Sequence, residues 1–400
     1  MSAKEAGTVT ARATSAVSHA NVVGGAACVS LIAIALANGG YFERTQRASA
    51  LALASLAGIA LLFRGRARFG VHERVALAAL VSLLAWTALS ALWSSSTAQP
   101  LREAERALVY VVGLAAVLIA SNRSSLPALL AGALAAIVLA SAYGLGSYLL
   151  AGKPANSEQH SLLYQPLGYA NAVGILAAMG VVLALGILGR ARWRALGALA
   201  VLVPTLALTS SRGAWVALGA GLTAAAALSL RRRGRLIVAG AVLAVGVGLV
   251  VAILSSPSQA DSWLGRRPGY WRTALNEYRA HPALGDGAGA FGRYWLQHPS
   301  ADPGVQGARD AHSLYIETLA ELGPIGLALL LIALGAPLAA LPRARSPAVP
   351  AAAGAYVAYL VHAGVDWDWE MPAVTLAALL CAAGVLAASR ESLQLKIQVQ

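Results

Sequence analysis

Long apolar runs alternate with short clusters of arginine along almost the whole chain. A helix needs roughly 20 apolar residues to cross the hydrocarbon core of a bilayer. Twelve segments approach that length, and their apolar runs are continuous, which predicts helices instead of barrel strands. The predicted spans cover residues 21–39, 48–63, 75–93, 106–121, 126–150, 168–189, 194–210, 213–230, 235–254, 324–341, 348–365 and 371–389.

Composition supports the same fold class, an all-α integral membrane protein of about 12 transmembrane helices. Of the 400 residues, 58% are hydrophobic and only 12% are charged, a balance outside the range of ordinary soluble proteins. The net charge of +13 would suit a nucleic-acid partner, but the 30 basic residues lie between the apolar runs. We therefore expect membrane lipids around the protein and no nucleic acid. Cys28 and Cys381 lie within apolar runs, so no disulfide is expected.

The basic residues also orient the predicted spans, because cytoplasmic loops are enriched in lysine and arginine. With both termini in the cytoplasm, 18 of the 30 basic residues lie inside and 6 lie in short outer connections. The arginine run 231–235 then marks an inner loop. The predicted organisation is a cytoplasmic tail (1–20), nine spans (21–254), an extracytoplasmic loop with short helices (255–311), a His-bearing helix with three spans (312–389), and a second cytoplasmic tail (390–400).

The long loop and the segment after it carry the most distinctive sequence. We expect a helix over 266–280, then a turn-rich stretch over 281–292. Asp310 is predicted to cap the following helix and to place His312 in its first turn, where the helix dipole disfavours the imidazolium and the neighbouring carboxylate favours it. A mostly neutral His312 could act as a general base, or it could simply hydrogen bond to a loop. Gly323 and Pro324 should kink this helix.

Four short motifs of the sequence together resemble those of a known family. His312 and Gly323, ten residues apart, resemble the His-x10-Gly signature of bacterial O-antigen ligases, within the superfamily of O-antigen ligases and polymerases. The resemblance covers roughly residues 164–340. The second motif, Ser211-Arg-Gly-Ala-Trp215, is similar to the family's Arg motif, although Val216 stands where the ligases have Leu. The third is Arg267 with His281-Pro-Ala-Leu-Gly-Asp-Gly287, which is similar to the family's loop Arg and the His-Pro-x-x-Gly turn after it. The fourth, Gly168-Tyr-Ala-Asn171, resembles a Gly-x-x-Asn element, although Leu162 and Leu163 stand where an Arg often precedes it.

The resemblance implies a GT-C-like, inverting glycosyltransferase of the bacterial cytoplasmic membrane that assembles surface polysaccharide without cofactor or metal. Its donor would be an undecaprenyl-pyrophosphate-linked glycan, and its acceptor a hydroxyl of a saccharide, a lipid or a wall polymer on the outer face. The implied catalytic residues are His312, Arg212 and Arg267, because arginine suits a departing pyrophosphate. Candidate substrate-binding residues are Arg266, Arg272, Asn171, Trp271 and Tyr315.

Simpler roles remain open for several of these residues. Arg212 could anchor a helix at the membrane interface, and Arg266 with Arg267 could contact lipid headgroups. Asn171 could cap span six instead of orienting substrate.

Two other patterns allow additional ligands. Asp366 and Asp368 have the Asp-x-Asp spacing that holds Mg²⁺ or Mn²⁺ in many glycosyltransferases, but we favour a polar turn over residues 366–370 and keep the metal site as the lesser alternative. The tryptophans of this turn lie in the interfacial belt or stack on sugars. Residues 287–292 fit G-x-G-x-x-G, but no strand precedes them, so a dinucleotide site is rejected.

Three alternatives to the ligase function remain at this stage. A polysaccharide polymerase of the same superfamily would share the architecture. A transporter of small anions or lipid-linked glycans would also fit twelve spans, but the charges lie at span ends and no repeat is visible. A noncatalytic assembly subunit would tolerate loss of His312 and Arg212.

Overall fold

The computed structural model describes residues 3–64, 69–150, 159, 161–230, 264–298 and 308–390. Every regular element in these ranges is helical. The predicted span 235–254 and the arginine run 231–235 lie outside the described residues. The α-helices are α1 (Ala3–Leu36), α2 (Glu43–Arg64), α3 (Val71–Leu89), α4 (Ala98–Ala120), α5 (Leu126–Leu150), α6 (Ala170–Ile187), α7 (Arg192–Leu208), α8 (Arg212–Ser229), α11 (Arg267–Ala280), α12 (Phe291–Gln297), α13 (Leu314–Ala340), α14 (Val349–His362) and α15 (Pro372–Ala388).

Each predicted span within the described ranges coincides with one of these helices. Six helices are long and apolar enough to cross a membrane, namely those that include His19–Leu36, Glu43–Phe63, Val71–Leu92, Leu126–Leu150, Ala170–Ile187 and Leu314–Ala340, and α14 and α15 are shorter apolar helices. The chain is therefore an α-helical membrane protein. The count of twelve spans stays a prediction, in part because the first turns of α4 carry four charged residues between Arg102 and Arg106.

The core of the bundle is formed around α15, in which every residue is buried. This helix packs against α1, α4, α5 and α14, while α14 lies on α8. Small residues allow the closest contacts, as is typical of helices in membranes. A Cβ on Gly221 of α8 would lie 2.6 Å from the carbonyl oxygen of Gly354 in α14, so these two backbones pack directly against each other.

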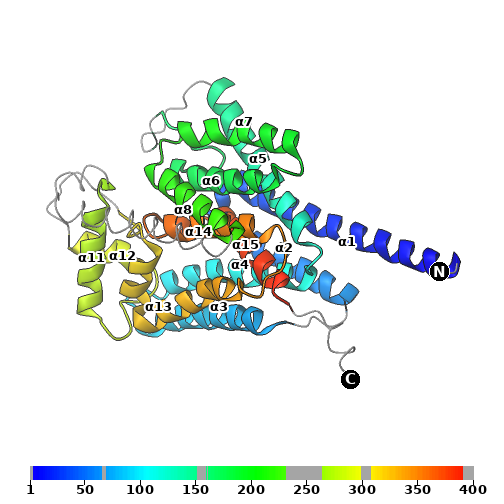
Figure 1. The fold of residues 1–400 in the computed structure, drawn as a ribbon. Helices are drawn as coiled ribbons and strands as arrows, with labels where there is room; N and C mark the ends of the chain where they lie inside the picture. Colours follow the sequence, from blue (N-terminus) through cyan, green and yellow to red (C-terminus); the bar gives the residue numbers. More distant parts are fainter. Residues whose placement is uncertain are drawn as a thin grey trace.

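The two ends of the bundle differ in composition. At one end, α11 and α12 form a small cap (Figure 1). An apolar cluster within it includes Tyr270, Phe291 and Trp295. The N-terminus of α1 lies at the opposite end (Figure 1). There Arg390 pairs with Glu73 at 2.7 Å, and Arg123 donates to the carbonyl oxygen of Arg345 at 3.0 Å. Residues from several predicted cytoplasmic loops thus gather away from the cap, although the side of the membrane that each end faces stays a prediction.

Three predictions about helix boundaries need correction. The cap helix begins at Arg267, one residue later than predicted. Asp310 does not cap α13, and His312 is not in its first turn: the helix begins at Leu314, with Ser313 at the N-cap position. The backbone N–H of Leu314 donates to the carbonyl oxygen of Ala363 at 2.8 Å, so a neighbouring helix supplies the acceptor that Asp310 was expected to supply.

The predicted kink in α13 is confirmed. Gly323 has φ 67° and ψ −171°, a combination that is almost confined to glycine. A Cβ there would lie 2.8 Å from the carbonyl oxygen of Ala283, in the turn after α11. The kink therefore lets the cap approach α13 closely, next to the site described below.

Candidate active site

His312 lies immediately before α13, between the cap and the helical bundle. Its ring stacks on Tyr270 of α11 with centroids 4.8 Å apart, and it meets Trp367 edge to face at 6.4 Å. Its Nδ1 lies 3.0 Å from the carbonyl oxygen of Asp310. Because a carbonyl only accepts, Nδ1 carries the hydrogen, and Nε2 of the neutral ring is left with a lone pair. His312 has φ 54°, a left-handed conformation that costs energy and is found disproportionately at functional sites.

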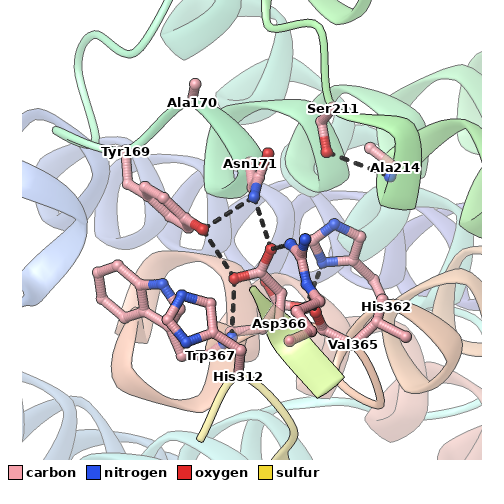
Figure 2. A network of polar contacts seen from close by, with 12 residues as sticks. Tyr169, Ala170, Asn171, Ser211, Ala214, His312, His362, Val365, Asp366 and Trp367 are labelled. Carbon is pink, nitrogen blue, oxygen red and sulfur yellow. Dashed lines mark hydrogen bonds and ion pairs between the residues drawn. The ribbon is translucent and has the colours of Figure 1, made fainter. Parts of the chain in front are cut away.

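A buried carboxylate, Asp366, connects several of the predicted site residues (Figure 2). It lies in the turn between α14 and α15 and is fully buried. Its Oδ1 accepts from the hydroxyl of Tyr169 at 2.9 Å, and its Oδ2 accepts from Nδ2 of Asn171 at 2.6 Å. Asn171 also donates to the Tyr169 hydroxyl at 2.8 Å. Asn171 therefore holds Asp366 and does not cap α6, whose N-cap position is occupied by Tyr169.

Arg267 completes this network from the cap. Its Nη2 lies 2.7 Å from Oδ2 of Asp366, and its Nε donates to the carbonyl oxygen of Val365. Burial alone would raise the pKa of Asp366, but the Arg267 guanidinium, with His362, lowers that pKa below its ordinary value. Asp366 is thus held as a carboxylate. The Arg267 side chain keeps 23% of its surface exposed, and its Nη1 donates to the carbonyl oxygen of Leu264 at 3.4 Å.

Arg212 begins α8 at the same end of the bundle. Ser211 caps the helix, accepting from the backbone N–H of Ala214 at 3.3 Å, and Ser210 before it has φ 53°. The Arg212 side chain is exposed. Gly213 packs directly against α14, because a Cβ on it would lie 3.1 Å from Nε2 of His362. The Ser-Arg-Gly motif thus combines a capped helix start, an exposed guanidinium and a close helix contact.

A second histidine, His362, is fully buried next to this motif (Figure 2). Its Nδ1 lies 2.6 Å from Oδ2 of Asp368, while its Nε2 has no hydrogen-bond partner among the described residues. Burial raises the pKa of Asp368. The two carboxylates proposed as metal ligands, Asp366 and Asp368, therefore already have cationic or hydrogen-bonding partners, which fits a structural turn better than an Asp-x-Asp metal site.

The other predicted substrate-binding residues are only partly gathered here. Trp271 lies beside the site, where its indole N–H donates to the carbonyl oxygen of His312 at 3.4 Å. Arg266 and Arg272 are exposed on the cap. Tyr315 instead joins two helices, because its hydroxyl donates to the carbonyl oxygen of Leu360 at 2.8 Å.

The glycine-rich segment 287–292 holds a carboxylate of the protein itself. The backbone N–H groups of Gly289 and Phe291 donate to the two carboxylate oxygens of Glu321 at 2.8 and 3.0 Å. Gly287 and Gly289 have positive φ, so the pattern reflects a tight turn docked on α13. This geometry agrees with the rejection of a dinucleotide site.

A cavity of about 840 Å³ lies between the cap and the starts of α2 and α4, and it is lined by residues 308–310, just before His312. Single carboxylate oxygens of Asp310, Glu317 and Glu370 lie within 4.8 Å of one another at its wall. Burial raises the pKa of Asp310 to about 6, although Arg106 opposes this. Among the described residues, this carboxylate group is also the candidate for holding a cation.

Sequence reasoning missed several parts of the site. Asp366 was considered only as part of a polar turn or as a metal ligand, and Tyr169, Tyr270 and His362 were not selected at all. The clearest available signal was the acidic turn itself, because charged residues joining two apolar helices require partners when they are buried.

A polytopic helical protein with a polar, histidine-bearing site at one end of its bundle is the class that this structure defines. Residues 197–331 match the model of the O-antigen ligase family. This match, over about a third of the chain, supports the resemblance to O-antigen ligases found in the motifs. The matched region includes Arg212, Arg267, His312 and Gly323, whereas Asn171 and Asp366 lie outside it. A search of curated proteins found no match.

Proposed function

We propose that this protein transfers a glycan from an undecaprenyl-pyrophosphate carrier to an acceptor hydroxyl on the outer face of the bacterial cytoplasmic membrane. The observation that carries the proposal is the hydrogen bond from His312 Nδ1 to the Asp310 carbonyl oxygen, because it leaves Nε2 ready to accept a proton. The family match supports the reaction class.

In the proposed reaction, the acceptor oxygen attacks the anomeric carbon of the donor while His312 Nε2 takes the hydroxyl proton. The bond between the anomeric carbon and the phosphate oxygen breaks, and undecaprenyl pyrophosphate leaves as an anion. Attack from the face opposite the leaving group inverts the anomeric configuration. Arg212 and Arg267 stabilise the charge that develops on the pyrophosphate.

Asp366 is assigned a positioning role in this reaction. It fixes the Arg267 guanidinium from one side, so that the remaining N–H groups face the leaving pyrophosphate. Held in this way, Arg267 requires little reorganisation as the charge develops.

The test is transfer from a labelled lipid-linked oligosaccharide to acceptor in proteoliposomes. His312→Ala should lower the rate by about 10²–10⁴-fold, the usual contribution of a general base. His298→Ala is the matched control, because His298 is an exposed cap histidine bonded only within its own turn. Full activity of His312→Ala would rule out the proposed base.

Cells lacking the protein would distinguish the two superfamily activities. Accumulation of single repeat units would indicate a polymerase, and accumulation of free lipid-linked polymer would indicate a ligase. Complementation with His312→Ala should fail in either case.

A further inference from the structure

The 840 Å³ cavity beside His312 has a lining that differs from the arginine side of the site. It is bounded by the start of α2, the start of α4, α12 and the segment leading into α13. Its size lies within the range of ligand pockets. The described charged residues that line it are the carboxylates of Glu43, Glu103, Asp310, Glu317, Glu321 and Glu370 and the guanidinium groups of Arg102, Arg106, Arg293 and Arg309.

The arginines of this cavity already have acceptors. Arg106 pairs with Glu103 at 2.6 Å and also with Glu370. Arg102 pairs with Glu43 at 2.9 Å, and Arg293 pairs with Asp286 at 2.7 Å. Arg309 donates to the Tyr41 hydroxyl at 3.5 Å. An anionic ligand would have to compete with these acceptors for the same N–H groups, which is unfavourable.

The carboxyl groups of the lining can hydrogen bond to ligand hydroxyl and ammonium groups. Hydrogen bonds to an ionised carboxylate are shorter and stronger than those between neutral groups. The carboxylate oxygens of Asp310, Glu317 and Glu370 form a compact group, and the backbone carbonyl oxygen of Asp310 lies 3.0 Å from His312 Nδ1. A polyhydroxylated ligand would therefore find its best partners close to the proposed base.

An aromatic contact joins the cavity to the base. Tyr41 lines the cavity and meets Trp367 edge to face with centroids 5.7 Å apart, and Trp367 in turn meets His312. Aromatic faces and edges suit the apolar C–H surfaces of sugar rings. Trp367 consequently links the lining of the cavity to His312.

We propose that this cavity binds the acceptor, and that the acceptor segment bound there is a saccharide without acidic groups, either neutral or amino-substituted. The inference rests on the proposed function, since it takes His312 as the base. The pyrophosphate of the donor then lies beside Arg212 and Arg267, so donor and acceptor occupy separate parts of the site.

Binding to the purified full-length protein tests the proposal directly. The probes are three soluble trisaccharides, namely neutral maltotriose, amino-substituted chitosan trisaccharide and anionic trigalacturonate, titrated with EDTA present. We expect the neutral or the amino-substituted probe to bind at least about tenfold more tightly than the anionic one, a difference of about 1.4 kcal/mol. Tightest binding by trigalacturonate, or binding by none of the three, would overturn the proposal.

Two pairs of matched variants place the probe in this cavity. Gln99→Trp fills the cavity from α4, whereas Leu101→Trp adds the same bulk on the same helix at an exposed residue that does not line it. Glu43 and Glu105 both pair with Arg47, but only Glu43 lines the cavity. Glu43→Lys therefore changes the charge of the lining, whereas Glu105→Lys makes the same change outside the cavity. Only Gln99→Trp should lose binding, and only Glu43→Lys should shift preference toward trigalacturonate. Equal effects within either pair would contradict the assigned place, provided that both members retain the wild-type melting temperature.

Binding measured on His312→Ala separates this inference from the proposed reaction. If His312→Ala binds the saccharide and also retains transfer, the proposed base is refuted and the saccharide site is supported. Loss of transfer in His312→Ala, with no saccharide bound by any form, would refute the site alone.

Discussion

Nη2 of Arg267 lies 2.7 Å from Oδ2 of Asp366, across 99 residues of chain. The first residue belongs to the cap and the second to the turn between the last two helices. Because Asp366 also accepts from Tyr169 and Asn171, this one carboxylate joins three separate parts of the chain around His312. The ion pair therefore connects the position of the cap to the geometry of the proposed site.

Asp366→Asn should strongly reduce transfer and weaken attachment of the cap. The substitution keeps the shape but leaves a partly buried guanidinium without its counter-charge, and breaking a buried pair costs about 3–5 kcal/mol. We expect a higher KM for the lipid-linked donor, measured in proteoliposomes, together with a lower melting temperature. Glu105→Gln, which breaks an exposed pair with Arg47, is the control and should change little. Wild-type KM and melting temperature in Asp366→Asn would contradict the positioning role.

The helices were largely predictable because the length of an apolar run determines where a helix can cross a membrane. The prediction for 126–150 coincides with α5. The predicted spans leave out the parts of helices that continue beyond the apolar run: α1 extends back to Ala3, and α4 begins at Ala98, ahead of its charged residues. Hydropathy identifies the membrane-embedded part of a helix and carries no information about its polar extensions.

The site was predictable only where the chemistry is local in sequence. His312, Gly323 and Arg267 belong to short motifs, whereas the role of Asp366 depends on partners up to 197 residues away. Local reasoning also failed at Asp310. The Ala363 carbonyl oxygen and the Glu317 carboxylate, which accepts from Ala311 N–H at 2.6 Å, satisfy donors at the start of α13 instead. Tertiary contacts thus replaced the expected side-chain cap.

Gly213→Ala tests the close contact between the Arg motif and His362. The new Cβ would lie 3.1 Å from Nε2 of a histidine that is fully buried and held by Asp368, so the ring has little freedom to move. We expect lower transfer and a lower melting temperature, even though alanine favours a helix by up to about 1 kcal/mol. Gly219→Ala in the same helix meets nothing within 4 Å and should be neutral or stabilising. Equal transfer and equal melting temperatures in the two variants would show that transfer and stability do not depend on this contact.

Glu277 should make the stability of the protein depend on pH. Its carboxylate is fully buried and has no hydrogen-bond partner among the described residues, and burial raises its pKa from 4.5 to about 9. Because the folded-state pKa exceeds the unfolded one, the contribution to stability is complete below pH 4.5 and is lost as the pH rises to about 9. Glu277→Gln should therefore raise the melting temperature at pH 8.5 more than at pH 5. The measurement is thermal unfolding at both pH values, with Glu105→Gln as the control. Equal shifts in melting temperature for the two variants would contradict the predicted dependence on pH.

Gly323→Ala should loosen the cap from the bundle. Alanine at φ 67° and ψ −171° is strained by about 1–3 kcal/mol, and its Cβ would also lie 2.8 Å from the Ala283 carbonyl oxygen. The turn that ends in Gly287, whose N–H donates to the Glu321 carbonyl oxygen at 2.8 Å, would have to move away from α13. We expect faster proteolysis within the cap and reduced transfer. Gly335→Ala, in the same helix where nothing lies within 4 Å, should leave both unchanged, and equal proteolysis rates for the two variants would show that the kink does not hold the cap.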